Sequence, residues 1–564
     1  MTMNNSEEAL LSQQLQRRLA RGQIDRRSFL RLAAAAGLTG GLVDHALAQR
    51  VPSRDKAIEG GYDYIVVGAG SAGSVVATRL AADGSRRVLL IEAGTGDLSR
   101  PTLASPFAWP ANQGTDVDWN YSTAPQRYAE NRVLKYPRGK VVGGSSSINA
   151  MLWVWGHASD FDGWAKSGCT GWDFDSLRHT FQAIETCGRA DELPARGKQG
   201  PMYVGRMAAS SPLNPAFFAA AHEQGLGHVN DINGPIQEGV GLMDLSVRDD
   251  RRFSVVHGYL LPALNRENLT LLTGSRVDRL LFEGTRCTGV RLTIDGRTRD
   301  IRASEETIVS AGAIDSPRLL MLSGVGPAAE LRSVGIAPIV DAPGVGDNLQ
   351  DHVRVPCFIA ETYEKALPGT RVDMHAFFRT GATNAAVEAQ ALFVPGVTTT
   401  SGLQSVPLGR DEGFTILLGL MQPRSRGRVK LMSAEPAGPL HIDPNYLSDP
   451  DDMRVLLRAT QRAEEIGMSA SLKAYRKRVH VRLPTTRGEL AQFIRQSLDT
   501  YWHPTGTCAM GTHKQAVVDP QLRVRGVSRL RVADASIMPT IPSGNTNAPT
   551  IMIGERAAQE LMGR

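Results

Sequence analysis

Three glycines near residue 70 have the spacing of a phosphate-binding turn. Residues 64–67, Tyr-Ile-Val-Val, form a short apolar run that is typical of a buried parallel strand. Gly68, Gly70 and Gly73 follow directly in the pattern G-x-G-x-x-G, and helix-compatible residues continue from 74 to 82. Glycines at these places permit a tight turn, a close approach of the backbone to a pyrophosphate, and close helix–strand packing. Free N–H groups at the helix N-terminus add to phosphate binding, so this unit predicts a dinucleotide site.

An acidic residue completes the dinucleotide motif. The next apolar run, 88–91, ends at Glu92, nineteen residues after Gly73. A carboxylate in this position can accept hydrogen bonds from a ribose 2′-hydroxyl, whereas it repels a 2′-phosphate and so disfavours NADP. The motif by itself does not choose between FAD and NAD.

A histidine near the C-terminus is a candidate for acid–base chemistry. His503 lies in residues 501–511, YWHPTGTCAMG, between a tryptophan and a proline and before small and polar residues. A histidine of the core normally has more apolar neighbours, and imidazole titrates near neutral pH. The alternative is a satisfied core histidine. Of the other histidines, we expect His257 to pack in the core, His352 to be structural or at an entrance, and His157 to be structural or beside a substrate cavity.

A second glycine-rich segment covers residues 138–149, RGKVVGGSSSIN. Its glycines and serines offer backbone N–H groups and hydroxyls with little steric bulk. Such a segment is a suitable lining for a phosphate or for the edge of a flavin ring. Its composition alone is equally compatible with a simple surface loop.

Three stretches together resemble the glucose–methanol–choline oxidoreductases. Residues 139–149 resemble the first signature of that family, residues 312–326, GAIDSPRLLMLSGVG, resemble the second, and residues 531–558 resemble its closing segment. The resemblance extends from about residue 62 to the end. It implies an α/β fold, in which a doubly wound, Rossmann-like FAD-binding domain joins an antiparallel-sheet substrate domain. It also implies oxidation of an alcohol with FAD as cofactor.

The resemblance assigns cofactor contacts to particular positions. Some choline oxidases of the family attach flavin through a histidine just before the asparagine of the first signature. Ile148 occupies that place here, and a hydrocarbon side chain cannot bond to flavin, so we expect non-covalent FAD. The implied cofactor contacts are Gly68, Gly70, Ser71, Ala72, Gly73, Glu92, Ala93, Gly139, Val142, Gly143, Gly144, Ser145, Asn149, Ala150, Met151, Val277, Ala311, Asp534, Ala535, Asn547, Pro549 and Thr550.

The resemblance also implies a catalytic pair. Family members carry a catalytic histidine in an H-P-x-G-T context and a histidine or asparagine downstream, which His503 and Asn547 match. In this interpretation His503 removes the hydroxyl proton of a primary alcohol, a hydride passes to flavin N5, and Asn547 holds the substrate oxygen. The alternative for Asn547 is a loop-capping amide.

One residue of the sequence bears on the electron acceptor. Tyr501 is bulky, and its position lies near the flavin face in oxidases of the family. This favours a dehydrogenase with a quinone or cytochrome-type acceptor over an oxidase that produces hydrogen peroxide. A lyase without net redox, like the family's hydroxynitrile lyases, is the other alternative. The particular alcohol and the oligomeric state stay open.

The expected domains are discontinuous. The FAD-binding domain takes residues 62–345 and the closing segment 498–564, with residues 160–250 straddling both domains. The substrate-binding domain takes residues 346–497.

The first 48 residues have the features of an export signal. Arg26 and Arg27 precede an apolar stretch from 29 to 43, and Ala-Leu-Ala at 46–48 is a small-x-small cleavage pattern. We expect a twin-arginine signal and a periplasmic protein. An ordinary amphipathic leader helix is the alternative. No later segment is apolar enough to predict a membrane span in the mature chain.

Charge and cysteine content exclude several classes of function. The formal charge is +6 over 564 residues, and no basic run is interleaved with aromatic residues, so nucleic acid is not an expected partner. The five cysteines form no C-x-x-C pair, which predicts neither a zinc site nor a redox pair. We expect them to be buried, and a disulfide between Cys169 and Cys187 is an alternative.

Overall fold

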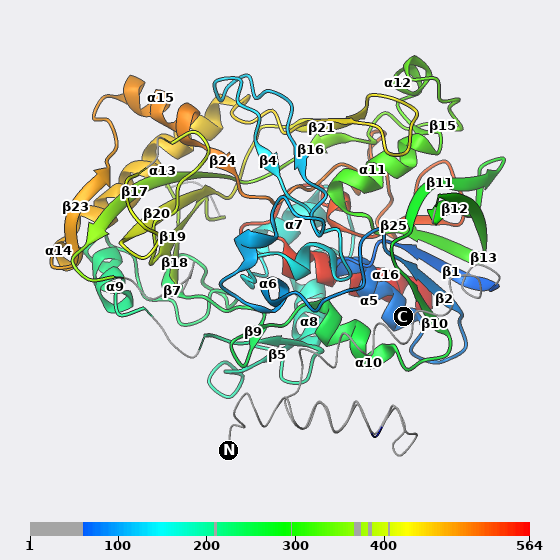
Figure 1. Ribbon diagram of the computed structural model, residues 1–564, viewed down its shortest axis with the longest axis horizontal. Coiled ribbons are helices and arrows are strands. Elements are labelled where there is room, and N and C mark those ends of the chain that lie inside the picture. The colour runs from blue at the N-terminus through cyan, green and yellow to red at the C-terminus, as the bar shows by residue number, and fades with distance from the viewer. Residues whose placement is uncertain are drawn as a thin grey trace.

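Two seven-stranded sheets organise the chain, and they lie side by side in Figure 1. The computed structural model describes residue 18 and residues 60–563, apart from 208–210, 295, 366–373, 382–385 and 404–405. The predicted export signal at 1–48 lies outside the described residues, with residue 18 as the exception.

The first sheet contains the dinucleotide unit. Its order is β10-β2-β1-β13-β12-β11, and β25 also pairs with β13. Strands β10, β2, β1, β13 and β25 run parallel to one another. Strand β12 pairs antiparallel with both β13 and β11. All four residues of β2 are buried, because a parallel sheet is covered on both faces. The strands are β1 (Tyr62–Val67), β2 (Val88–Ile91), β10 (Leu269–Leu272), β11 (Arg276–Glu283), β12 (Arg286–Ile294), β13 (Arg297–Val309) and β25 (Leu530–Val532).

Three helices place chain segments at the carboxyl ends of these strands. Helix α5 (Ser71–Leu80) follows β1, and α11 (Gly312–Leu322) follows β13. Helix α16 (Asn547–Met562) comes from the end of the chain and packs directly against α5. The closing segment therefore lies beside the first glycine-rich turn and the helix that follows it.

The second sheet is antiparallel. Its order is β23-β17-β20-β19-β18-β7, and β24 pairs with β17. The long helix α13 (Pro450–Met468) packs against β17 and β20. The parallel sheet and this antiparallel sheet together confirm the expected α/β fold with a separate antiparallel sheet. The strands are β7 (Gly239–Leu242), β17 (Val353–Thr362), β18 (Met374–Phe378), β19 (Ala389–Val394), β20 (Gly413–Leu420), β23 (Arg476–Val481) and β24 (Asp499–Thr500).

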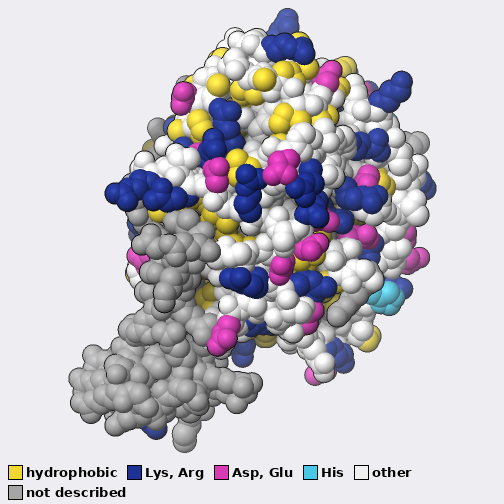
Figure 2. Space-filling model, turned by 90° about the vertical axis from the view of Figure 1, so that its right-hand side faces the viewer, with side chains coloured by type: hydrophobic (Ala, Val, Ile, Leu, Met, Phe, Trp, Pro, Cys, Tyr) yellow, Lys and Arg dark blue, Asp and Glu magenta, His cyan; other side chains and the backbone are white. Residues whose placement is uncertain are grey.

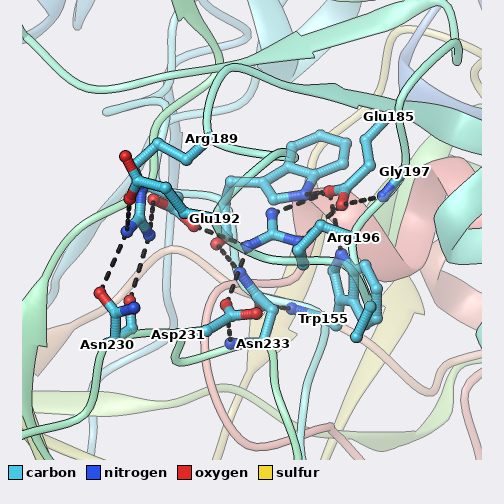
Figure 3. A network of polar contacts seen from close by, with 12 residues as sticks. Trp155, Glu185, Arg189, Glu192, Arg196, Gly197, Asn230, Asp231 and Asn233 are labelled. Atoms are coloured by element: carbon cyan, nitrogen blue, oxygen red, sulfur yellow. Dashed lines mark hydrogen bonds and ion pairs between the residues drawn. The ribbon is translucent and has the colours of Figure 1, made fainter.

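A buried ionic cluster ties the segment after the second glycine-rich loop to residues 185–244 (Figure 3). Arg196, whose side chain is fully buried, donates to both carboxylate oxygens of Glu185, at 2.6 and 2.9 Å. It also donates to Asp231 at 2.9 Å and to Asp244 at 2.7 Å. The indole N–H of Trp153 donates to Glu185 at 2.8 Å. The cluster thereby anchors the chain directly after residues 149–152, which line the cavity described below.

The cysteines are buried, as we expect from the sequence, and the alternative of a disulfide is excluded. All five cysteines are buried and free, so the alternative of a Cys169–Cys187 disulfide is wrong. On the face shown in Figure 2, lysine and arginine side chains are interspersed with acidic ones. No helix among the described residues has both the length and the apolar character to cross a bilayer.

Candidate active site

A cavity of 760 Å³ connects the two sheets. At one side it is lined by Val67 and Glu92, at the carboxyl ends of the parallel strands β1 and β2, where open α/β sheets bind ligands. At the other side it is lined by Leu392 of β19 and Leu417 of β20. The cavity therefore has a dinucleotide half on the first sheet and a second half on the antiparallel sheet.

The two glycine-rich loops meet at the wall of the dinucleotide half. A Cβ on Gly144 would lie 2.8 Å from the Cα of Gly70, which a side chain cannot do without a shift of the backbone. Helix α5 begins at Ser71 without a side-chain hydrogen bond from its N-cap residue, Gly70, so its first N–H groups are available to a phosphate. Gly73 has the packing role, because a Cβ there would stand 2.0 Å from the carbonyl oxygen of Gly68.

Glu92 is fixed by the backbone around it. Its Oε2 accepts from the N–H of Ala69 at 3.0 Å, and its Oε1 accepts from the N–H of Gly94 at 2.8 Å. Burial raises the pKa of this carboxyl to about 7. Each oxygen retains a lone pair that can accept from a ribose hydroxyl, so the residues present fit the nucleotide part of FAD.

Most of the predicted cofactor positions line this cavity. The exceptions are Gly73, Val142, Gly143 and Pro549, which are not among its lining residues. Gly143 shapes the loop instead, with φ of +88° and no room for a Cβ beside the Ser147 hydroxyl. The predicted positions that line the cavity are Gly68, Gly70, Ser71, Ala72, Glu92, Ala93, Gly139, Gly144, Ser145, Asn149, Ala150, Met151, Val277, Ala311, Asp534, Ala535, Asn547 and Thr550.

His503 also lines the cavity, and the amide beside it is that of Asn545 rather than that of the predicted Asn547. The Nε2 of His503 lies 3.2 Å from Nδ2 of Asn545. Asn547 is the first residue of α16, and its Oδ1 instead accepts from the hydroxyl of Ser71 at 2.8 Å. The amide beside His503 is therefore two residues earlier than we predicted. The Oδ1 of Asn545 is buried and has no hydrogen-bond partner among the described residues, so it is available to a ligand hydroxyl.

His352 determines which nitrogen of His503 carries the proton. The Nε2 of His352 lies 3.2 Å from the carbonyl oxygen of Met421, which can only accept, so Nε2 is the protonated nitrogen. Burial lowers the pKa of His352 to about 3, which leaves its Nδ1 as an acceptor. The Nδ1 of His503, 3.0 Å away, must then donate to it. His503 is thereby held with Nε2 unprotonated, and this nitrogen accepts from Nδ2 of Asn545 at 3.2 Å.

The backbone around His503 is held as firmly as its ring. Asp351 accepts from the N–H of His503 at 2.7 Å and, through its other oxygen, from the hydroxyls of Tyr136 at 3.0 Å and Thr500 at 2.5 Å. Trp502 has φ of +64°, a strained conformation for a bulky residue. Arg138 donates to its carbonyl oxygen at 2.5 Å, which helps to hold that conformation.

Sequence reasoning missed two members of this site. We expected His352 to be structural or at an entrance, but it is fully buried and contacts the His503 ring. His257 is buried as expected, and burial lowers its pKa to about 4. A signal for His352 was present, because the polar run Gln-Asp-His at 350–352 directly precedes the entirely buried residues 353–360. The choice between Asn545 and Asn547 has no such signal, because both lie in one loop of similar residues.

Models of one protein family match most of the chain. One model of GMC oxidoreductases matches residues 62–354, and a second model of the same family matches residues 423–554. This chain belongs to the GMC oxidoreductase family. Members of the family bind FAD, and the recognition made from three sequence stretches is confirmed.

Curated GMC relatives cover nearly the whole chain. The oxygen-dependent choline dehydrogenase of Brucella anthropi is 39% identical over 535 residues, which cover 89% of this chain and 96% of the relative. The mitochondrial choline dehydrogenase of Homo sapiens is 39% identical, with 89% and 90% covered. An alcohol dehydrogenase [acceptor] of Pseudomonas putida is 37% identical, with 88% and 95% covered.

Solved GMC structures have the same fold. Pyridoxine 4-oxidase from Mesorbium loti superimposes with a TM-score of 0.85 at 35% identity, covering 89% of this chain and all of that one. A formate oxidase variant of Aspergillus oryzae, studied for FAD modification, has a TM-score of 0.83 at 25% identity, with 90% and 98% covered. The relatives include both dehydrogenases and oxidases, so this chain is an oxidoreductase whose electron acceptor the comparisons leave open.

Proposed function

We propose that this GMC oxidoreductase converts a primary alcohol to an aldehyde, with His503 as the base. The observation that carries the proposal is the imidazole of His503, partly buried on the cavity wall with Nδ1 toward His352 and Nε2 toward Asn545. A neutral base of this kind is what removal of a hydroxyl proton requires. The polar groups of Asn545 lie beside it and can orient the alcohol oxygen.

FAD, when bound in the cavity, supplies the acceptor for the hydride that leaves the alcohol carbon. The residues that would hold it are the two glycine-rich loops, Glu92 and the N-terminal turns of α5 and α16. Ile148 supports non-covalent binding, since its side chain has no atom that can bond to the flavin. The second N–H of Asn545 can donate to the alcohol oxygen, and Nε2 of His503 takes the hydroxyl proton in place of the hydrogen bond from Asn545. As His503 gains this proton, its hydrogen bond to His352 becomes charge-assisted and stronger.

We infer that the enzyme is a dehydrogenase with a quinone or cytochrome-type acceptor. In support, the buried ring of Tyr501 lies 4.8 Å from that of His503, and its hydroxyl donates to Gln390 at 2.8 Å. This ring fills space beside the base that oxygen would otherwise enter. The alternative, an alcohol oxidase, predicts stoichiometric peroxide in air at the rate seen with artificial acceptors. Export to the periplasm by the twin-arginine route remains part of the proposal.

An anaerobic titration tests the proposed reaction. The purified yellow holoenzyme is mixed with a panel of primary alcohols, and the oxidised-flavin band is followed. Bleaching by an alcohol, with formation of the aldehyde, is the expected result. An intact flavin that no alcohol bleaches, together with release of an aldehyde from a cyanohydrin, would favour a lyase instead.

Two asparagines of one loop give a matched test of the corrected pair. Asn545→Ala removes the amide beside His503, and we expect anaerobic flavin reduction to slow by roughly 10²–10³-fold with FAD retained. Asn547→Ala removes the hydrogen bond to Ser71, and we expect it mainly to weaken FAD retention during dialysis. Reduction rates per bound FAD separate the two effects. A larger rate loss in Asn547→Ala than in Asn545→Ala would instead support Asn547 as the partner of His503, as predicted from the sequence.

The pH dependence follows from the environment of His503. Burial lowers the pKa of His503 well below its ordinary 6.5, and the neighbouring His352, Arg138 and Arg354 lower it further. The base works when unprotonated, so a lowered pKa keeps it active as the pH falls below 6.5. We expect the rate of flavin reduction to stay constant through that pH and to fall only in more acidic buffer. A rate that already declines with an apparent pKa of 6.5 or higher would contradict this environment.

A further inference from the structure

The half of the cavity around His503 is rich in positive charge. Outside the dinucleotide half, the charged lining residues of the cavity are four cations, Lys135, Arg138, Arg354 and Arg410, and one acid, Asp499. Lys135 and Arg410 are exposed, whereas Arg354 is buried. Asp351 lies behind this wall, where its oxygens are occupied by His503, Tyr136 and Thr500. The remaining charged lining residues belong to the dinucleotide half, on the first sheet and α11.

Arg354 has hydrogen-bonding capacity that the protein does not use. It lies on β17, opposite Asp499 of β24, and its Nη2 is 3.5 Å from the Asp499 carboxylate. Its side chain is only 11% exposed. Its Nε is buried and has no hydrogen-bond partner among the described residues. A buried guanidinium donor without a partner is costly, and a ligand acceptor in the cavity can satisfy it.

The aromatic surface beside Arg354 is already occupied by a cation. The guanidinium carbon of Arg354 lies 4.0 Å from the centroid of the Trp502 ring. Recognition of a quaternary ammonium needs an open aromatic face, usually with an acid nearby. Here the face of Trp502 is covered by positive charge. A second cation, Arg138, donates to the carbonyl oxygen of Trp502. A carbonyl oxygen carries no net charge, so this hydrogen bond does not neutralise the positive charge of Arg138.

We propose that this site selects alcohols that carry a carboxylate, which Arg354 binds, and that it discriminates against choline. Arginine presents a planar fork of N–H donors that matches a carboxylate. The hydroxyl end of such a substrate lies at His503 and Asn545, and the carboxylate lies toward Arg354. The inference rests on the proposed alcohol oxidation and names its substrate class. It separates this chain from the choline dehydrogenases that it resembles in sequence.

Matched substrates test the inference on the wild-type holoenzyme. We compare para-(hydroxymethyl)benzoate, its uncharged methyl ester, benzyl alcohol and choline by the second-order rate constant of anaerobic flavin reduction. A charge-assisted hydrogen bond predicts a preference of roughly 10–100-fold for the carboxylate over the ester. Binding of benzoate, followed by the shift of the flavin band, should be tight and should weaken with added salt. Equal rates for acid and ester, or faster reduction by choline, would overturn the inference.

Variants locate the effect. Arg354→Gln should abolish the preference, measured as the ratio of the carboxylate rate to the ester rate within the variant, and should weaken benzoate binding by the same factor. Arg291→Gln is the matched control, because Arg291 is exposed and paired with Asp300 on a distant hairpin. A preference that persists in Arg354→Gln would also overturn the inference. If none of the alcohols reduces the flavin, the proposed alcohol oxidation fails, and benzoate binding still tests the anion site separately.

Discussion

His503→Ala is expected to slow anaerobic flavin reduction by roughly 10²–10⁴-fold while the protein stays yellow. The variant lacks the lone pair that takes the hydroxyl proton, so the alcohol must lose its proton to water. The FAD content should be unchanged, because the nucleotide contacts come from other residues. Stopped-flow measurement of the flavin band at saturating alcohol gives the rate directly.

Two controls separate the base from a general disturbance of the site. His513→Ala changes an exposed histidine only ten residues away and should keep the wild-type rate. Imidazole added to His503→Ala should restore part of the lost rate, since it can enter the vacated space and accept the proton. A wild-type rate of flavin reduction in His503→Ala would show that His503 is not the base.

Arg196→Met is expected to cause the largest loss of stability, about 3–5 kcal/mol of the free energy of unfolding. The substitution leaves Glu185, whose side chain is 0% exposed, as a buried carboxylate without its cation. It also removes the nearest cation of Asp244, which keeps Arg206 at 3.3 Å and Arg189 at 3.5 Å. The midpoint of urea unfolding, measured at neutral pH, reports the loss. Arg178→Met provides the control, because Arg178 is 47% exposed and lies 4.0 Å from Asp175, and it should change stability by less than about 0.5 kcal/mol.

The pH dependence gives the Arg196 prediction a second readout. Without Arg196 the charge of the buried Glu185 carboxylate is uncompensated, and a proton bound in the folded variant removes that charge. Acidification therefore stabilises the variant relative to wild type. The difference in free energy of unfolding between the two proteins should shrink as the pH falls from 7 toward the carboxyl pKa values of the unfolded chain, near 4. A deficit that does not change with pH would indicate lost packing rather than unpaired charge.

The dinucleotide half could be predicted from the sequence because it is local. The strand, the glycine turn, the helix and Glu92 all lie within residues 62–92, and the short connections leave little choice of topology. The family resemblance then supplied the second glycine-rich loop and His503. Each of these predictions depends on residues close together in the chain.

The catalytic half could be predicted only in part, because its contacts join distant segments. His352 reaches His503 from 151 positions earlier in the chain, through the pairing of β17 with β24. Asn545 and Asn547 differ by two positions in one loop, and only the start of α16 decides that the first faces His503 while the second faces Ser71. Arg354 and Asp499 are likewise neighbours across strands. None of these distances follows from local sequence patterns.

Deuterium at the hydroxyl-bearing carbon gives the most direct test of alcohol oxidation by hydride transfer at this site. The wild-type holoenzyme is reduced anaerobically by a primary alcohol and by the same alcohol deuterated at that carbon. We expect the oxidised-flavin band to bleach in both cases, deuteration to slow the bleaching several-fold, and His503→Ala to slow it with either substrate. Absence of bleaching, or bleaching that is indifferent to both deuteration and loss of His503, would contradict alcohol oxidation at this site.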